Sequence, residues 1–239
     1  MAAYQSNLNK LVFDVETAGE KFEDLDKTTQ ELLELRFKRT AKDDAELELA
    51  KQRLSFYPET CQIVCIGMMN PDTDKGVAYY QGKEPQASNQ DGVQYVPCAT
   101  EKDLLEHFWD DAARYEEFIS FNGNTFDVPM IMLRSAVQGI RPSKNLAVNR
   151  YLNLQPANLK HVDLFDQLSF YNARWGGLGL HFWSRAFGIA SPKEGEISGD
   201  KVTEAFYAGR GKEIAMYCMD DVKATAKLYE QWTKFLRFS

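Results

Sequence analysis

The sequence predicts one mixed α/β domain that spans residues 1–239. Three segments before residue 82 are expected to be strands, because their apolar residues run continuously or alternate over a few positions. From about residue 100 onward, helical patterns with apolar residues three and four apart surround one further short strand. Strands in the first part and mostly helices in the second indicate a mixed sheet flanked by helices.

The composition is that of an ordinary globular protein and limits the function only loosely. Hydrophobic residues make up 44% of the chain, and no apolar run approaches the length of a membrane span. The first six residues lack the basic-then-apolar pattern of a signal peptide, so we expect a cytoplasmic protein with no membrane partner. The four cysteines form no C-x-x-C pair, which indicates neither a zinc site nor a disulfide framework.

The charge balance is acidic, with a net charge of −7 at pH 7. This balance argues against a broad basic face that grips duplex DNA. It leaves nucleic-acid binding open, because acids that surround bound metal ions count as negative only until the site is loaded.

The first half of the chain is expected to supply most of the sheet. A strand is predicted at residues 11–17, followed by a helical insertion over residues 20–57 with two amphipathic helices. Residues 61–69 form a near-continuous apolar run typical of a central strand, and residues 76–81 are expected to be its hairpin partner. Residues 82–99 are polar and contain prolines and glycines, so we expect a loop.

The second half is expected to be mainly helical. Thr100 is the predicted N-cap of a helix, residues 117–121 form a strand, and a helix opens at Asp127 and ends at Gly139. Residues 140–158 give no clear pattern, and a further element starts at His161. A loop over residues 175–180 leads into a helix that stops near Gly188, and the last helix covers residues 211–238.

Two acids interrupt the first predicted strand. Side chains alternate along a strand, so Asp14 and Glu16 share one face while Phe13 and Val15 share the other. Two carboxylates on a core strand repel each other and lose hydration, which is costly unless a cation compensates. The pattern therefore favours a divalent metal site, or else an edge strand with solvated acids.

Further acids lie far along the chain. Asp127 follows a strand and a tight turn, where it could serve a site or merely cap the next helix. Tyr217 and Asp221 are four residues apart on the buried face of the last helix, whereas Asp220 lies on its solvated side. Four inward acids from three segments suit a two-metal phosphoryl-transfer site, with Tyr217 placed to orient or deprotonate a water.

These residues also carry a family resemblance. The chain resembles the DEDD superfamily of 3′→5′ exonucleases, in the subclass with tyrosine in the third motif and in the stand-alone branch akin to the exonuclease domain of family B DNA polymerases. Residues 14–17 (DVET) match the first motif, residues 122–127 (NGNTFD) the second, and residues 217–221 (YCMDD) the third. Residues 161–164 and the glycine-rich approach at 177–180 are also similar to this branch.

The resemblance implies a ribonuclease H-like fold and a site with two Mg²⁺ or Mn²⁺ ions. It implies that Asp14 bridges the ions, with Glu16 and Asp221 on one and Asp127 on the other, and that Tyr217 positions the nucleophile. Near the substrate it places the four residues Thr17, Asn122, Phe126 and His161. For His161, an element start capped by Asp163 is an equal alternative.

The substrate is expected to be the 3′ end of single-stranded or frayed DNA, released as nucleoside 5′-monophosphates. RNA or short oligoribonucleotides are the alternative substrate, and a degenerate domain that binds nucleic acid or a partner without catalysis is the alternative function. Basic and aromatic side chains between the second and third motifs could follow the strand. The candidates are Arg174, Trp175, Arg185, Lys193, Lys201, Arg210 and Lys212.

Overall fold

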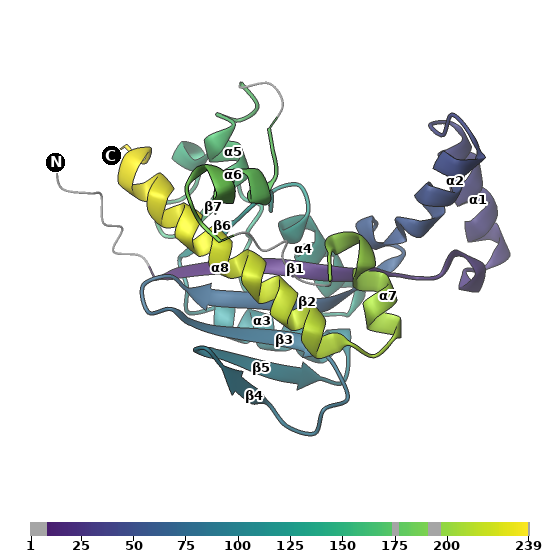
Figure 1. The fold of residues 1–239 in the computed structure, drawn as a ribbon, viewed down its shortest axis with the longest axis horizontal. Coiled ribbons are helices and arrows are strands. Elements are labelled where there is room, and N and C mark those ends of the chain that lie inside the picture. Colours follow the sequence, from purple (N-terminus) through teal and green to yellow (C-terminus); the bar gives the residue numbers. More distant parts are fainter. Residues whose placement is uncertain (1–8, 174–176, 191–196, 239) are drawn as a thin grey trace.

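A seven-stranded mixed sheet organises the molecule (Figure 1). The computed structural model describes residues 9–173, 177–190 and 197–238. The strand order is β4-β5-β3-β2-β1-β6-β7, and the strands are β1 (Lys10–Gly19), β2 (Cys61–Asn70), β3 (Lys75–Gln81), β4 (Ser88–Gln90), β5 (Val93–Cys98), β6 (Glu117–Ser120) and β7 (Lys160–Asp163). β1 pairs antiparallel with β2 and parallel with β6, which confirms the predicted mixed α/β class.

The expected loop over residues 82–99 is wrong, because it contains β4 and β5. Val93 and Tyr95 are buried, and the side chain of Gln94 between them is exposed. This alternation is the strand signal, but proline and glycine in the same stretch obscured it. Asp91 and Gly92 both adopt positive φ, 50° and 77°, in the turn that joins the two strands.

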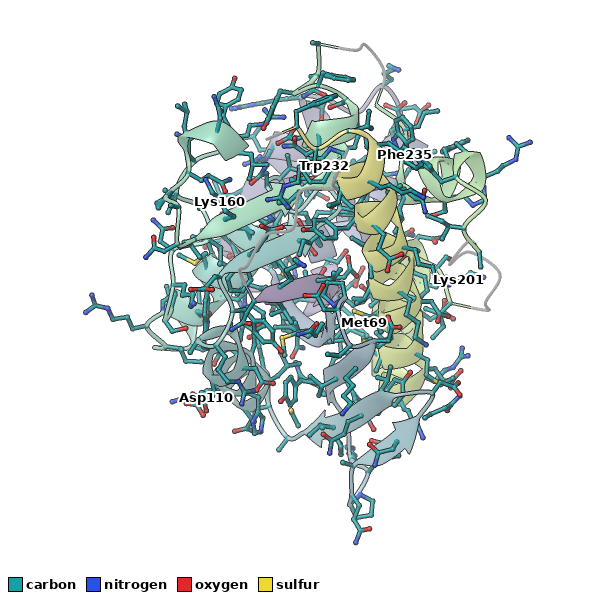
Figure 2. All side chains as sticks on the ribbon, turned by 90° about the vertical axis from the view of Figure 1, so that its left-hand side faces the viewer. Met69, Asp110, Lys160, Lys201, Trp232 and Phe235 are labelled. Atoms are coloured by element: carbon teal, nitrogen blue, oxygen red, sulfur yellow. The ribbon has the colours of Figure 1, made fainter. Side chains whose placement is uncertain are left out.

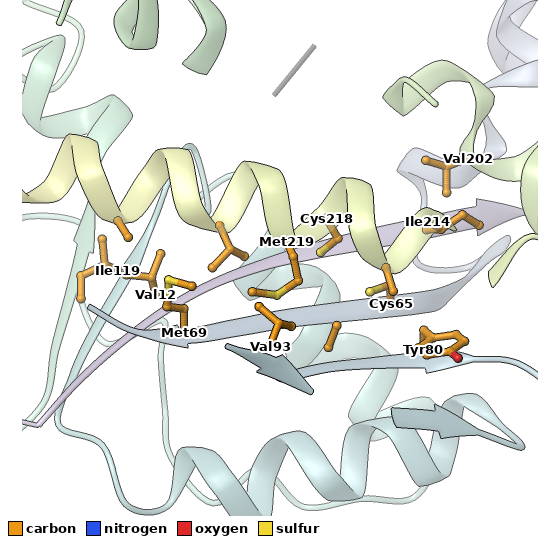
Figure 3. Close-up of a cluster of buried hydrophobic side chains, with 14 of the residues drawn as sticks. Val12, Cys65, Met69, Tyr80, Val93, Ile119, Val202, Ile214, Cys218 and Met219 are labelled. Carbon is orange, nitrogen blue, oxygen red and sulfur yellow. The ribbon is translucent and has the colours of Figure 1, made fainter. Parts of the chain in front are cut away.

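The long helix α8 (Gly211–Phe235) covers one face of the sheet. Figure 3 shows Met219 and Cys218 of this helix beside Cys65 and Met69 of β2. The approach is close, because a Cβ atom at Gly67 would lie 2.9 Å from the sulfur of Cys218. Glycine in β2 therefore lets α8 lie directly on the middle strands.

The helices α3 (Glu101–Ala112) and α4 (Asp127–Val137) pack on the opposite face. Thr100 caps α3 as predicted, and its hydroxyl accepts a hydrogen bond from the N–H of Asp103. Gly139 follows the C-cap of α4 with a φ of 72°, as expected for a helix end. In Figure 2, Asp110 of α3 and Lys201 lie on opposite sides of the sheet.

Residues between β1 and β2 form the predicted helical insertion. It contains η1 (Phe22–Asp24), α1 (Lys27–Lys38), α2 (Asp44–Gln52) and η2 (Leu54–Phe56), and α1 and α2 project beyond the sheet (Figure 1). A small core of Phe37, Leu47 and Leu54 holds the insertion together. The apolar stripe is only partly buried, because Leu32 and Leu35 are 62% and 55% exposed.

The remaining described elements surround the ends of the sheet. They are η3 (Leu152–Leu154), α5 (Leu164–Leu168), α6 (Leu180–Ala186), η5 (Gly199–Lys201) and α7 (Val202–Tyr207). The last helix, α8, ends at Phe235 rather than at 238. All four cysteines are buried and free, and none of the described helices is long and apolar enough to cross a membrane.

Candidate active site

The acids of β1 face α8. Phe13 and Val15 point into the core beneath α3 and α4, so the intervening Asp14 and the following Glu16 point to the other face. One carboxylate oxygen of each acid and the sulfur of Cys218 lie within 4.8 Å of one another. Glu16 is only 9% exposed and Asp14 is half-buried, so the two carboxylates are largely shielded from water.

Asp127 reaches the same strand from α4. Its Oδ1 accepts a hydrogen bond from the backbone N–H of Val15 at 3.0 Å, and the residue is 3% exposed. β6 pairs with β1 only as far as Val12, so this carboxylate satisfies a β1 donor beyond the end of the ladder. The N-cap of α4 is Phe126 and makes no side-chain capping bond. The carboxylate of Asp127 therefore binds the backbone of β1. In the simple capping alternative it would instead bind the first turn of α4.

The loop that carries Asp127 is held by Asp163. Its carboxylate accepts backbone N–H bonds from Asn122 at 2.8 Å and Asn124 at 2.9 Å, and it also caps α5 through Phe165 at 3.0 Å. Burial raises the pKa of Asp163 to about 6 in spite of these three donors. Asp163 thus acts as a positioning residue for the second motif, a role that its place beside His161 in the sequence did not reveal.

Tyr217 and Asp221 complete the cluster from α8. Burial, followed by the charges of Glu16, Asp221 and Asp14, raises the pKa of Tyr217, so its hydroxyl lies near these acids. Asp220 points away, with an exposed side chain 4.0 Å from Lys223. The two neighbouring acids of the third motif therefore have different surroundings, as their helical positions indicate.

The four carboxylates interact electrostatically. Burial, then the charges of Asp127, Asp221 and Glu16, hold the pKa of Asp14 well above its usual range. Burial and the charges of Asp221 and Asp127 do the same for the pKa of Glu16. Burial raises the pKa of Asp127 to about 7, although the Val15 N–H favours its ionised form. Ionising all four groups therefore requires a compensating positive charge.

The donor set fits hard divalent cations. Carboxylate oxygens are the ligands that Mg²⁺ and Mn²⁺ prefer. The raised pKa values of Asp14, Glu16 and Asp127 show that no positive charge among the described residues compensates these carboxylates. Exonuclease domains of this kind generally use divalent metals, and Asp14, Glu16, Asp127 and Asp221 are the residues that would hold them.

Cys218 is a neighbour of the site that the sequence pattern did not single out. Its sulfur lies 3.6 Å from Asp14 Oδ2 and 3.5 Å from the Asp14 carbonyl oxygen. Burial raises its pKa, so the thiol stays protonated and donates to Asp14. The signal available beforehand was its position directly after Tyr217 on the buried face of the helix.

The expected substrate residues have varied surroundings. Thr17 is 6% exposed and its hydroxyl donates to the Ser55 carbonyl at 2.8 Å. Asn122 is half-buried and its Oδ1 accepts from Thr125 at 2.8 Å. Phe126 is half-buried, with its ring 5.9 Å from that of Phe56.

His161 has structural partners. It is 4% exposed, its Nε2 lies 2.8 Å from the hydroxyl of Ser120, and its ring packs against Phe13. Burial lowers its pKa to about 4, which keeps the ring neutral. These contacts support the structural alternative to the expected substrate contact.

The basic residues between the second and third motifs are only partly described. Arg174, Trp175 and Lys193 lie outside the described residues. Arg185 and Lys201 are exposed, whereas the guanidinium of Arg210 forms an ion pair with Glu213. A strand path through these residues stays a prediction.

Comparisons with known proteins identify the family and the fold of the chain. Residues 58–238 match the model of a family described as predicted 3′-5′ exonucleases related to the exonuclease domain of PolB. The chain belongs to this family. The match begins after the insertion, so the first motif and the helical insertion lie outside it.

The fold of this predicted PolB-related exonuclease is also found in a solved structure. The family B DNA polymerase from the hyperthermophilic archaeon Pyrobaculum calidifontis aligns over 97% of the chain with a TM-score of 0.58 and 17% sequence identity. The alignment covers 25% of the polymerase chain, and the likeness establishes a shared fold of the polymerase exonuclease type. A search of the curated proteins found no significant match.

Proposed function

We propose that this chain is a metal-dependent 3′→5′ exonuclease that removes nucleoside 5′-monophosphates from single-stranded or frayed DNA ends. The convergence of Asp14, Glu16, Asp127 and Asp221 carries the proposal, because buried carboxylates that raise one another's pKa values need cations between them. The family assignment supports the exonuclease reaction, while the DNA substrate rests on the likeness to polymerase exonuclease domains.

The residues of the cluster have two separate roles in this proposal. Asp14 and Glu16 on β1, Asp127 on α4 and Asp221 on α8 would hold two Mg²⁺ or Mn²⁺ ions. When bound, such ions lower the pKa of a water and neutralise charge on the scissile phosphate. Burial and the nearby acids raise the pKa of the Tyr217 hydroxyl, which would position the nucleophile.

The supporting residues hold these groups in place. The hydrogen bond from Val15 to Asp127 ties α4 to β1, and Asp163 fixes the loop before Asp127. The thiol of Cys218 orients the carboxylate of Asp14 from the side of α8. In this proposal the acids from three segments are held together before substrate binds, as preorganisation of charge requires.

Digestion of end-labelled strands tests the proposal. Matched single-stranded DNA and RNA should be incubated with Mg²⁺ or Mn²⁺, with EDTA, and with an Asp14→Ala variant. We expect 5′-labelled DNA to give a ladder that shortens from its 3′ end, and 3′-labelled DNA to release a mononucleotide first, only with metal and native protein. Faster digestion of RNA would reassign the substrate, and no metal-dependent cleavage of either strand would refute the proposal.

A further inference from the structure

A groove separates the helical insertion from α7 and α8. Its volume is about 1050 Å³, at the upper end of ordinary ligand pockets. One wall is the end of the insertion and the other contains Tyr217, which lies one helical turn before Asp221 on α8. The two walls contribute Leu49, Gln52, Arg53, Ser55, Phe56 and Tyr57 on one side and Ile197, Ser198, Gly199, Asp200, Thr203 and Tyr217 on the other.

The insertion wall is fixed to the catalytic strand. The hydroxyl of Thr17, next to Glu16, donates to the Ser55 carbonyl at 2.8 Å. A Cβ atom at Gly19 would lie 2.5 Å from the Ser55 nitrogen, so β1 and η2 are in direct backbone contact. Leu54 is buried beside this contact. These contacts hold η2 in a fixed position against β1.

Phe56 extends from this fixed wall and is only partly covered. Its side chain is 58% exposed, although its ring centroid lies 5.9 Å from that of Phe126 at an interplanar angle of 59°. Phe126 directly precedes Asp127, so the ring pair lies one residue from the carboxylate cluster. An exposed aromatic ring beside a groove is a surface on which a nucleic-acid base can stack.

Arg53 supplies positive charge to the same wall. Its side chain is exposed and lines the groove three residues before Phe56. Guanidinium groups bind phosphate oxygens through paired N–H donors, and they are attracted to the backbone of a single strand. An aromatic ring and a cation in one groove wall are the two components of sequence-tolerant single-strand binding.

We propose that Phe56 and Arg53 form a nucleotide subsite supplied by the insertion, in which Phe56 stacks a base next to the 3′-terminal nucleotide and Arg53 binds an adjacent phosphate. The subsite lies outside residues 58–238, so it is a feature of this chain beyond the segment that the family model matches. It rests on the proposed exonuclease function and gives the insertion a role in holding single-stranded substrate.

Binding of single-stranded DNA with 2-aminopurine next to the 3′-terminal nucleotide tests the stacking, with Ca²⁺ replacing Mg²⁺. Phe56→Ala and Phe56→Leu should weaken binding by roughly 5- to 100-fold and abolish the quenching that stacking causes. Phe56→Trp should restore both. Leu32→Ala removes another exposed apolar side chain of the insertion, 62% exposed on α1, and should change neither.

Arg53→Gln tests the phosphate contact. Each phosphate neutralised on a single strand contributes about 0.7 to the slope of log K against log salt concentration, so the slope should fall by about that amount. Arg39→Gln, at an exposed arginine of the same insertion, should leave the slope unchanged.

The possible results separate the two proposals. Native affinity and quenching in Phe56→Ala, or in Phe56→Leu, would overturn the stacking subsite while leaving the exonuclease proposal intact. An unchanged salt slope in Arg53→Gln would remove Arg53 from it. A native protein that neither binds nor degrades single strands would refute the exonuclease function itself, and with it the subsite.

Discussion

Replacing Asp127 by Asn should stabilise the metal-free protein at alkaline pH. The substitution removes the charge but keeps an oxygen that can accept the hydrogen bond from Val15. The pKa of Asp127 rises from its ordinary 3.8 to about 7 in the folded state. At about 1.36 kcal/mol per pKa unit, ionising this buried group costs on the order of 4 kcal/mol of folding stability.

The pH dependence follows from the direction of the pKa change. Below about pH 4 the carboxyl is protonated in both states and contributes no difference. Between about pH 4 and 7 the folded state binds a proton that the unfolded state lacks, so stability falls as the pH rises. Above about pH 7 Asp127 is ionised in the folded state, and the full loss of folding stability is present. The Asn variant has no carboxylate to ionise and does not lose this stability.

Thermal melts in EDTA measure this effect. For a chain of this length, 1 kcal/mol shifts the Tm by about 2–4 °C, so Asp127→Asn should melt roughly 8–16 °C above the native protein at about pH 8. The two should converge at about pH 4. Asp110→Asn, at an exposed acid on α3, should stay within about 0.5 kcal/mol of the native protein. Equal Tm values for native and Asp127→Asn protein at both pH values would refute the reasoning.

Three further substitutions test the division of roles. Asp14→Ala should abolish metal-dependent hydrolysis yet leave a folded protein by circular dichroism, and residual cleavage at the native rate would exclude Asp14 as a ligand. Tyr217→Phe should lower kcat less than loss of a carboxylate does, because an orienting hydroxyl is only one contributor; a loss as large as that of Asp14→Ala would contradict this. Asp163→Ala should lower both Tm and kcat, because three backbone N–H groups lose their acceptor, and an unchanged kcat would remove Asp163 as a positioning residue.

The sequence alone predicted the elements in which apolar residues recur with a clear helical or strand period. The strand around Asp14, the long final helix and the two insertion helices follow from apolar spacing. Spacing within an element also predicted that Asp221 faces inward and Asp220 outward, since a helix imposes that difference directly.

Contacts between distant segments were harder to anticipate. No local pattern shows that the carboxylate of Asp163 accepts bonds from Asn122 and Asn124, about forty residues earlier. The contact between Ser55 and Thr17 likewise depends on how the insertion returns to the sheet. β5 was missed because Pro97 and nearby polar residues outweighed its alternating buried side chains.

A crystal of the protein soaked with Mn²⁺ tests the central claim most directly. Anomalous difference density locates the ion without reference to any assumed ligand. We predict two peaks enclosed by the carboxylates of Asp14, Glu16, Asp127 and Asp221, and no peak at this position in an Asp14→Ala crystal. Manganese bound only elsewhere, or none at these four acids, would contradict the account.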